Sequence, residues 1–437
     1  MAYKPEIPPE KARAGQVMSW SMYDFANTIF SMNVVSLYFP LLIVVSLGYR
    51  DIYVAVANSL SMLVVAVSAP FLGQLTDTIG RRKPALFIAT AICCAATVAI
   101  GFYARAGVNV YILLALFFVA NIAYQIGLVF YNSLLPSVAP KGMIGRIGGI
   151  GVAVGYIGSI VGMIFVLPFN EGALFGIDIP WIEAGGREAT FIPTAILFVI
   201  FSLPIFLFLK EKRNPAPPID NISPVKMIIE TLRDTKKYPG IRRFLVGKLF
   251  FQEGIETAIL FMGVYSEKAI GLGDSLKIQF FVVATAFAAV GSWFFGKVVD
   301  RHGAWKTLMG VLVGWVISLV ALVLLNGKMV FFGMGAIIGI LLGGVWTASR
   351  PLLIELSPPE NIGRFFGLYS LSGKTAAILG PILWGLSTLL LGSLGDTYAY
   401  RGAILVLAVM IAVGAVVLRP LKRDIEDRLS NRTKFYL

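Results

Sequence analysis

A lysine, Lys374, lies in the middle of the apolar stretch Arg364–Gly380. In a helix it would lie about 15 Å from the start of that stretch, halfway through the hydrocarbon core of a bilayer. An unpaired ammonium is unstable at this depth, so a lysine there indicates a polar cavity or an acidic partner. Acids at similar depth in other apolar stretches are Asp24, Glu253 and Glu256. These charged groups are the first candidates for binding a solute or a coupling ion.

Asp24 has polar neighbours on its own helix face. It lies about 12 Å into its apolar stretch, counted from Gln16. Asn27, Thr28 and Ser31 follow it at spacings of three, four and seven residues, which share one side of a helix. We therefore expect Asp24 and Asn27 to face the same cavity.

The stretch that holds the two glutamates carries a stripe of polar side chains. Lys248, Gln252 and Glu256 recur every four residues, and Glu253 lies three residues before Glu256. Carboxylates and an ammonium around one cavity can hold the two ends of a zwitterion, or exchange a proton during transport. The structural alternative is that Lys248 pairs with Glu256 within its helix, and that the acid of the first stretch pairs with the central lysine to lock two halves together.

The composition is that of an integral membrane protein. Of the 437 residues, 57% are hydrophobic and 14% are charged, whereas soluble domains have about 25% charged residues. Long apolar stretches, separated by charges or by Gly and Pro, predict an all-α fold with twelve membrane-spanning helices. The expected spans are 17–46, 52–73, 84–104, 110–137, 147–169, 189–209, 241–267, 276–297, 306–325, 330–356, 364–393 and 401–420.

The basic residues indicate the orientation. The termini, the even-numbered loops and the central linker hold 28 of the 37 Lys and Arg residues, whereas the odd-numbered loops hold seven. Because cytoplasmic loops carry the excess of Lys and Arg, we expect a multi-pass protein of the cell membrane with both termini in the cytoplasm. The net charge of +13 then reflects topology rather than a nucleic-acid-binding surface.

A polar, basic and Pro-rich segment divides the spans into two sets of six. This segment, 210–240, predicts a cytoplasmic linker. It separates an N-terminal six-helix bundle, 1–209, from a C-terminal six-helix bundle with a cytoplasmic tail, 241–437.

The two halves repeat. GQLTDTIGRRK after the second span and GKVVDRHGAWK after the eighth share a glycine, an aspartate and a second glycine at an offset of 223 residues. After the fourth and tenth spans, six positions match at an offset of 218, among them Gly155 with Gly373. In the first and seventh spans, YDFAN and QEGIE can be laid over each other so that Asp24 matches Glu253. The chain is therefore expected to be a tandem duplication, which in many transporters places the substrate site between the repeats.

These motifs resemble a known superfamily. GQLTDTIGRRK resembles the signature between the second and third helices of the major facilitator superfamily, and GKVVDRHGAWK resembles its C-terminal copy. WSMYDFANTIF, YNSLLPSVAP with GRIGGIGVAVGYIGS, and SRPLLIELSPPENIGRFFGLYSLSGK resemble the branch of the autophagy-related vacuole effluxers and their prokaryotic relatives. The resemblance covers nearly the whole chain. It implies two pseudo-symmetric six-helix bundles with alternating access, helices one and seven against a central cavity, and, for the eukaryotic relatives, export of amino acids from the vacuole.

A more distant likeness is to sodium- or proton-coupled glycoside porters, whose eleventh helix has a lysine that Lys374 matches. Those porters hold their cation with acids in helices two and four, where this chain has only Asp51, at the outer edge. We therefore expect a secondary active transporter of a small polar solute, with an amino acid as first substrate and a proton as coupling ion. A sugar or glycoside porter is the alternative within transport, and a non-transporting membrane sensor is the alternative outside it.

Charged residues in the cytoplasmic loops predict a gate. An acid that lies at the positive N-terminus of a neighbouring helix and pairs with arginines forms a latch that must break during transport. Acids and arginines of this kind follow the second and eighth spans, and Arg350 and Glu355 lie near the inner end of the tenth. The predicted latch comprises Gly73, Asp77, Gly80, Arg81, Arg82, Asp300, Arg301, Arg350 and Glu355.

The remaining patterns do not predict an enzyme, a cofactor or a metal site. SGKT at Ser372–Thr375 imitates the end of a nucleotide-binding loop, but the required first glycine would fall at Leu368 and no strand is predicted before it. No cluster has the spacing of metal ligands. Glycines at every third or fourth position of the fifth span, Gly148–Gly162, predict close helix packing. The expected partners are a small-molecule substrate, the proton and membrane lipid, and the chain is expected to be a monomer.

Overall fold

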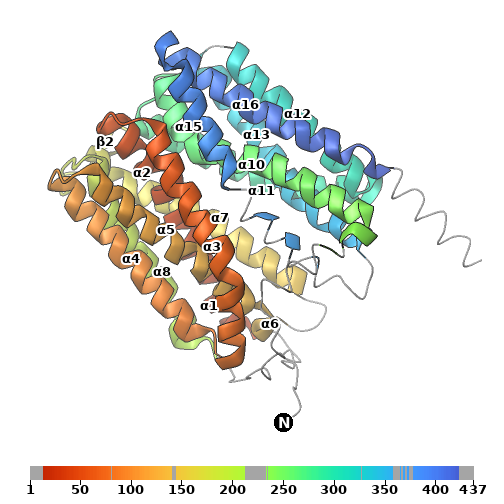
Figure 1. Ribbon diagram of the computed structural model, residues 1–437. Helices are drawn as coiled ribbons and strands as arrows, with labels where there is room; N and C mark the ends of the chain where they lie inside the picture. Colours follow the sequence, from red (N-terminus) through yellow and green to blue (C-terminus); the bar gives the residue numbers. More distant parts are fainter. Residues whose placement is uncertain are drawn as a thin grey trace, which may run out of the picture. The chain divides into compact units, whose positions relative to one another are not determined.

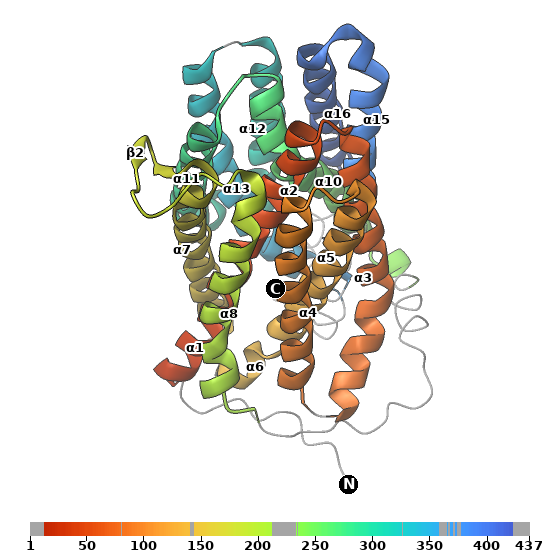
Figure 2. The ribbon, with the colours of Figure 1, turned by 90° about the vertical axis from the view of Figure 1, so that its left-hand side faces the viewer.

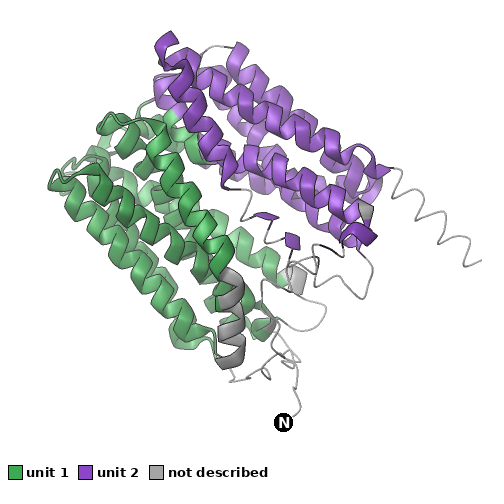
Figure 3. Cartoon of the chain, in the orientation of Figure 1, with its two compact units in different colours: residues 1–224, 260–264, 273–279 green, residues 225–259, 265–272, 280–437 purple. Residues whose placement is uncertain are grey.

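The chain is built almost wholly of helices (Figure 1). The computed structural model describes residues 13–79, 81–139, 144–211, 233, 235–325, 327–357, 365, 368–369, 372–373 and 377–422. The described chain falls into two compact units, shown in different colours in Figure 3. Unit 1 comprises residues 1–224, 260–264 and 273–279, and unit 2 comprises residues 225–259, 265–272 and 280–437. The boundary between 224 and 225 lies inside the predicted linker, most of which is outside the described residues.

Unit 1 contains six long helices. They are α1 (Ala14–Phe30), α3 (Asp51–Ile79), α4 (Lys83–Arg105), α5 (Val110–Ser133), α7 (Ile144–Glu171) and α8 (Phe191–Phe208), with the short helix α6 (Leu135–Val138) and the 3₁₀ turn η3 (Arg187–Thr190) between them. Local signals start some of these helices. Asn109 accepts a hydrogen bond from the backbone N–H of Tyr111 at the start of α5, and Pro84 occupies the first turn of α4, where its missing N–H has no helical partner to lose.

The first span departs from a regular α-helix in its second half. After α1 the backbone continues as the π-helical segment η1 (Ser31–Tyr38), the short helix α2 (Phe39–Leu41) and the π-helical segment η2 (Leu42–Ser46). Pro40 lies inside α2, where its ring and its missing N–H disfavour a regular α-helical turn. Each π-helical turn changes the face on which later side chains lie, so spacings of three and four residues no longer predict that face.

A two-stranded hairpin interrupts the helical pattern between α7 and η3. Its strands, β1 (Ala173–Leu174) and β2 (Ile177–Asp178), are antiparallel, with Ala173 opposite Asp178. The hairpin lies at the end of unit 1 opposite to α6 (Figure 2). The hairpin was not predicted, because two-residue strands are too short to show an alternating pattern.

Unit 2 contains the remaining long helices of the described chain. They are α10 (Pro239–Lys268), α11 (Asp274–His302), α12 (Ala304–Leu324), α13 (Lys328–Leu356), α15 (Leu379–Leu391) and α16 (Asp396–Leu418), with the 3₁₀ turns η4 (Thr235–Lys237) and η6 (Gly392–Leu394). Two of them, α10 and α15, differ in their described bounds from the predicted spans 241–267 and 364–393. Residues 260–264 of α10 and 274–279 of α11 are grouped with unit 1.

Among the described residues, ten helices are long and apolar enough to cross a membrane. Two further helices lie at predicted spans. The helix α10 is 30 residues long but carries several charged side chains, and α15 is described over 13 residues. These twelve elements match the twelve spans that the sequence predicts.

Glycines bring α1 and α7 close together in unit 1, as the sequence predicts for the fifth span. A Cβ added at Gly158 would collide with the backbone of Phe25, and one at Gly162 would lie 2.8 Å from the side chain of Ile29. A Cβ at Gly155 would lie 3.1 Å from the Asp24 carboxylate. Small residues at the crossing therefore fix the position of Asp24 against the backbone of α7.

Candidate functional site

Asp24 lies half-buried on α1, at its contact with α7. One turn later, the Thr28 hydroxyl donates a hydrogen bond of 2.6 Å to the Gly155 carbonyl of α7. One turn earlier, Trp20 stacks on Tyr131 with ring centroids 4.6 Å apart and donates to its carbonyl at 3.2 Å. These contacts hold the helix on both sides of Asp24. The Asp24 carboxylate itself forms no hydrogen bond or ion pair with any residue that the structure describes.

Two buried asparagines continue the polar stripe of the first span. Asn27 is 3% exposed, and none of the described residues donates to its Oδ1. Asn33, on η1, is fully buried, and neither polar atom of its amide has a hydrogen-bond partner within the described part of the chain. Buried amides normally form hydrogen bonds, so these groups are available to a solute or to water. The sequence predicted Asn27 but missed Asn33, because the π-helical geometry breaks the spacing on which that prediction relied.

In unit 2, Lys248 is buried on α10, with 2% of its surface exposed. Its ammonium donates to the Tyr369 carbonyl at 2.9 Å and to the Ser372 hydroxyl at 3.2 Å, and it lies 4.0 Å from the centroid of the Tyr369 ring. Glu256, two turns along the same helix face, lies within electrostatic reach of this ammonium. The direct partners of Lys248 are therefore neutral groups, and the predicted alternative of a hydrogen-bonded pair with Glu256 is not formed among the described residues.

The other side chains of this stripe are also hydrogen-bonded. The Gln252 amide nitrogen donates to the Glu256 carboxylate at 2.6 Å. The Gln252 Oε1 atom is buried and receives no hydrogen bond from the residues described. Lys248, Gln252 and Glu256 thus present a cation, an amide and an anion along about 12 Å of one helix. We call these three residues the α10 stripe.

Glu253 has a different environment from the stripe. It is 1% exposed, and its carboxylate accepts the backbone N–H of Leu379 at 3.0 Å and the backbone N–H of Gly380. These are N–H groups of the first turn of α15, which have no partner within that helix. A Cβ at Gly380 would lie 2.6 Å from the Glu253 carboxylate and would also collide with Thr257, so α10 and α15 pack closely here. Glu253 therefore caps α15.

The lysine predicted to act with these acids, Lys374, lies outside the described residues. Its neighbour Gly373 is described, and a Cβ there would lie 2.9 Å from the Gln252 amide and 3.3 Å from the Lys248 ammonium. The backbone just before Lys374 is therefore next to the α10 stripe. The role of Lys374 itself stays a prediction.

At the predicted latch after the second span, the carboxylate at the start of α4 belongs to Glu211, which the prediction did not include. Glu211 accepts the backbone N–H of Arg82 at 2.6 Å and that of Lys83 at 3.0 Å, at the start of α4. The Lys83 ammonium donates to the Phe206 and Leu209 carbonyls at the end of α8. The negative charge of Glu211 thus lies at the positive N-terminus of α4, and the positive charge of Lys83 lies at the negative C-terminus of α8. These contacts hold α4 and α8 together.

The other latch residues are distributed as follows. Arg81 is exposed. Gly80 lies outside the described residues. The side chains of residues 73–79, a range that includes Gly73 and Asp77, also lie outside them. Asp300 and Arg301, at the end of α11, are exposed. Within unit 2, the Glu355 carboxylate accepts the backbone N–H of Ala304, the first residue of α12, and the Arg350 guanidinium lies within electrostatic reach of the Tyr369 hydroxyl. Glu355 therefore repeats at α12 the arrangement that Glu211 forms at α4.

An ion cluster that the sequence did not predict lies in unit 1. Asp274, at the start of α11, accepts hydrogen bonds from both Nε and NH2 of Arg187 at 3.0 Å, from the Asn170 amide at 2.6 Å and from the Lys277 ammonium. Lys277 is fully buried and Asp274 is 9% exposed. The Asp274 carboxylate is the shared acceptor, so its removal would take away a hydrogen-bond partner of Arg187, Asn170 and Lys277 at once and would be strongly destabilising. The cluster therefore holds α7, η3 and the start of α11 together. Sequence spacing did not indicate it, because Arg187 and Asn170 lie 87 and 104 residues before Asp274, and only Lys277 is a near neighbour in the chain.

The described residues contain no group of three His, Cys, Asp or Glu side chains that could hold a metal ion. The side chains described above can bind charged and hydrogen-bonding groups, and their carboxylates and ammonium can exchange protons.

Comparison with known proteins identifies relatives of the whole chain. The family model described as vacuole effluxer Atg22 like matches residues 50–425. The MFS-type transporter YxiO of Bacillus subtilis is 26% identical over 417 residues, which cover 92% of this chain and 94% of that protein. Autophagy-related protein 22-2 of Aspergillus clavatus is 26% identical over 303 residues, which cover 61% of this chain and 46% of that protein.

Solved structures share the fold at low sequence identity. A bacterial homolog of the human lysosomal transporter Spinster matches with a TM-score of 0.70 and 14% identity, over 94% of this chain and 96% of that one. The nucleoside transporter NupG matches with a TM-score of 0.70 and 14% identity, over 93% of this chain and 98% of that one. The fold is that of the major facilitator superfamily, an all-α membrane protein of twelve helices, and both the family and the fold are those of transporters rather than enzymes.

Proposed function

Because the chain belongs to the vacuole effluxer Atg22-like family, we propose that it is a secondary active transporter of a small polar solute that works by alternating access. The first substrate to test is an amino acid, and the proposed coupling ion is a proton. The observation that carries the substrate proposal is the α10 stripe, in which a buried ammonium lies on the same helix face as a carboxylate.

The stripe offers complementary charges to a zwitterion. The Lys248 ammonium contacts a carbonyl, a hydroxyl and an aromatic ring, none of which neutralises it, so it can bind a solute carboxylate. The Glu256 carboxylate can bind a solute ammonium, and the Gln252 amide between them can bind either polar end. A neutral sugar or nucleoside would use the hydrogen-bonding groups of the stripe but would offer no charge to Lys248 or Glu256.

Asp24 is the proposed proton-exchanging group. Among the described residues its carboxylate has no hydrogen-bond partner, so its protonation breaks no structural contact. Asn27 lies one turn away on the same helix and supplies a buried amide that can bind solute or water. Lys374 is retained as a second proposed solute-binding group.

We also propose that the protein lies in the cell membrane with both termini in the cytoplasm. The support is the distribution of the basic residues, 28 on the side of the termini and seven on the other. Labelling single cysteines at the C-terminus and at Lys328 with a membrane-impermeant reagent in intact cells tests this orientation. Labelling at Lys328 alone supports it, and labelling at the C-terminus alone contradicts it.

Transport by the purified protein tests the function. The protein is reconstituted in liposomes, and uptake of labelled neutral, acidic and basic amino acids is measured with and without a pH gradient at a clamped membrane potential. A panel of sugars and nucleosides is measured in parallel, and empty liposomes are the control. Uptake of an amino acid that the gradient accelerates supports the proposal. Uptake of a sugar or a nucleoside, without uptake of any amino acid, would contradict the amino acid proposal and assign the substrate to that other class. The absence of flux for every solute would favour the non-transporting sensor.

A further inference from the structure

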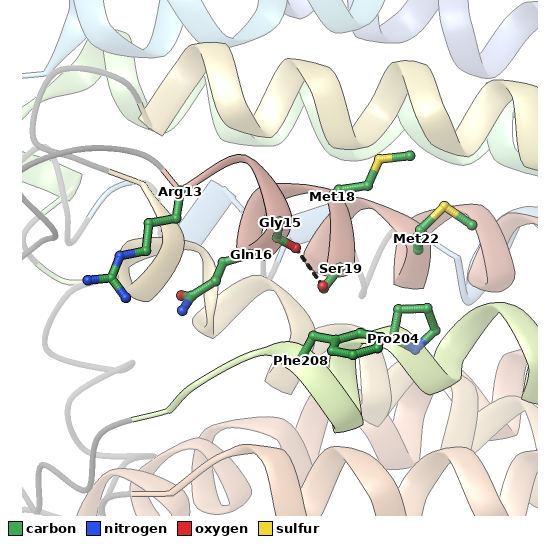
Figure 4. A pocket seen from close by; sticks show the side chains of 8 residues that line it. All are labelled: Arg13, Gly15, Gln16, Met18, Ser19, Met22, Pro204 and Phe208. Atoms are coloured by element: carbon green, nitrogen blue, oxygen red, sulfur yellow. Dashed lines mark hydrogen bonds between the residues drawn. The ribbon is translucent and has the colours of Figure 1, made fainter.

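A cavity opens in unit 1 where α1 begins and α8 ends (Figure 4). Its volume is about 510 Å³. It lies outside the α10 stripe and does not include Asp24. Its lining residues are Arg13, Gly15, Gln16, Met18, Ser19, Met22, Pro204 and Phe208.

One part of the lining is apolar and faces outwards. Met18 is 55% exposed, Phe208 is 64% exposed, and Leu207 beside it is 68% exposed. Figure 4 shows Phe208 and Pro204 of α8 on the side facing α1. In a protein whose helices cross a membrane, exposed apolar side chains at the end of two spans are the surface that acyl chains cover. Methionine side chains adapt to flexible chains of this kind.

The other part of the lining is basic and polar. Arg13 directly precedes α1 and is exposed, and the Gln16 amide lies on the first turn. Lys210, also exposed, follows Phe208 by two residues. The acid next to it in the chain, Glu211, is directed to the start of α4, where it accepts two backbone N–H groups. The Ser19 hydroxyl donates to the Gly15 carbonyl at 2.6 Å, so it does not contribute a free donor.

We propose that this cavity binds an anionic phospholipid. The phosphate contacts the Arg13 guanidinium and the Gln16 amide, because a planar guanidinium binds phosphate through two parallel hydrogen bonds. One acyl chain lies along Met18, Met22 and Phe208. The argument is charge complementarity beside an exposed apolar surface, and it is independent of the proposed transport activity. With both termini in the cytoplasm, as proposed above, the lipid belongs to the inner leaflet.

Lipid binding by the purified full-length protein tests this site. Native mass spectrometry of the delipidated protein, titrated with dioleoyl phosphatidylglycerol or with dioleoyl phosphatidylcholine, gives the affinity for each lipid. The wild type is expected to bind phosphatidylglycerol about fivefold more tightly, since one basic residue near a membrane surface contributes roughly that factor. Arg13→Gln is expected to abolish the preference, and Arg13→Lys to keep part of it.

Four comparisons decide the outcome. Arg105→Gln removes an equally exposed arginine from the last turn of α4 and is expected to leave the preference unchanged. Phe208→Gln is expected to weaken binding of both lipids alike, because it alters the acyl-chain surface and not the charge. A preference that survives Arg13→Gln overturns the proposal. Full competition by millimolar inorganic phosphate also overturns it, because the site would then bind a free anion rather than a lipid.

Discussion

Asp24 and Glu253 occupy matching positions in the two repeats, yet their surroundings differ. On α1 of unit 1, Asp24 is half-buried and forms no hydrogen bond or ion pair with the part of the chain that the structure describes. On α10 of unit 2, Glu253 is 1% exposed and accepts two backbone N–H groups at the start of α15. A carboxylate held in this way stabilises a helix, whereas a carboxylate without partners can bind a proton or a solute.

The glycines that face the two acids show the same division. Gly155 and Gly373 correspond at an offset of 218 residues, and so do Gly162 and Gly380. In unit 1, Gly155 lies against Asp24. In unit 2, Gly380 lies against Glu253, and the residue that corresponds to Gly380 in unit 1 is Gly162 rather than Gly155. Gly373 lies instead against Gln252 and Lys248. The glycines of the predicted repeat thus lie against different groups, and the charged group that we propose to face a solute is an acid in unit 1 and the α10 stripe in unit 2.

The largest expected effect is on folding and separates the two acids. Glu253→Gln replaces one accepting oxygen with an NH₂ group that faces a backbone N–H, so we expect the free energy of unfolding to fall by about 3 kcal/mol. The matched change, Asp24→Asn, removes no hydrogen bond among the described residues and is expected to cost under about 1 kcal/mol. Thermal unfolding of both variants in detergent measures the difference. Equal losses would mean that both acids have the same structural role.

Lys248→Met tests the α10 stripe and is expected to have the next largest effect. Methionine keeps much of the side-chain length without the charge, so the variant should fold and reach the membrane. Loss of a charged hydrogen bond of about 2 kcal/mol corresponds to a roughly 30-fold weaker affinity for the solute. The KM for uptake in proteoliposomes measures it. An unchanged KM would mean that Lys248 has only a structural role. Lys374 would then be the remaining predicted lysine for binding the solute carboxylate.

The smallest expected difference between matched variants comes from the paired glycines. Gly380→Ala places a methyl group 2.6 Å from the Glu253 carboxylate and 2.9 Å from its backbone oxygen, whereas Gly155→Ala places one 3.1 Å from the Asp24 carboxylate. Overpacking costs about 1–3 kcal/mol, and we expect Gly380→Ala near the upper end and Gly155→Ala near the lower. Melting temperatures of the two variants measure the order. The reverse order would contradict the contacts assigned to Glu253.

Much of the fold could be predicted from the sequence, because it depends on patterns within single segments. The spans follow from hydropathy, and the close approach of α1 and α7 from the small residues of the fifth span. The repeat of matched glycines and acids stays a prediction. The hairpin β1–β2 and the π-helical turns around Pro40 could not be predicted, because neither has a periodic signal.

The candidate site was predicted only in part. Helical spacing identified Asp24, Asn27 and the α10 stripe, which lie on regular helices. It could not identify the partners of Lys248 and Glu253, because these partners belong to segments more than 100 residues away in the chain. Asn33 was missed because it lies within the π-helical segment η1, where α-helical spacing does not hold. The same limit explains why Glu211, rather than a residue of the predicted latch, is found at the start of α4.

The central claim is that the uncapped acid of unit 1 couples transport to protons. The most direct test is the ratio of amino acid uptake with and without a pH gradient, measured for the wild type and for Asp24→Asn in the same liposomes. The account predicts a ratio well above one for the wild type and about one for Asp24→Asn, since an amide cannot exchange the proton. A variant that responds to the gradient as strongly as the wild type would contradict it.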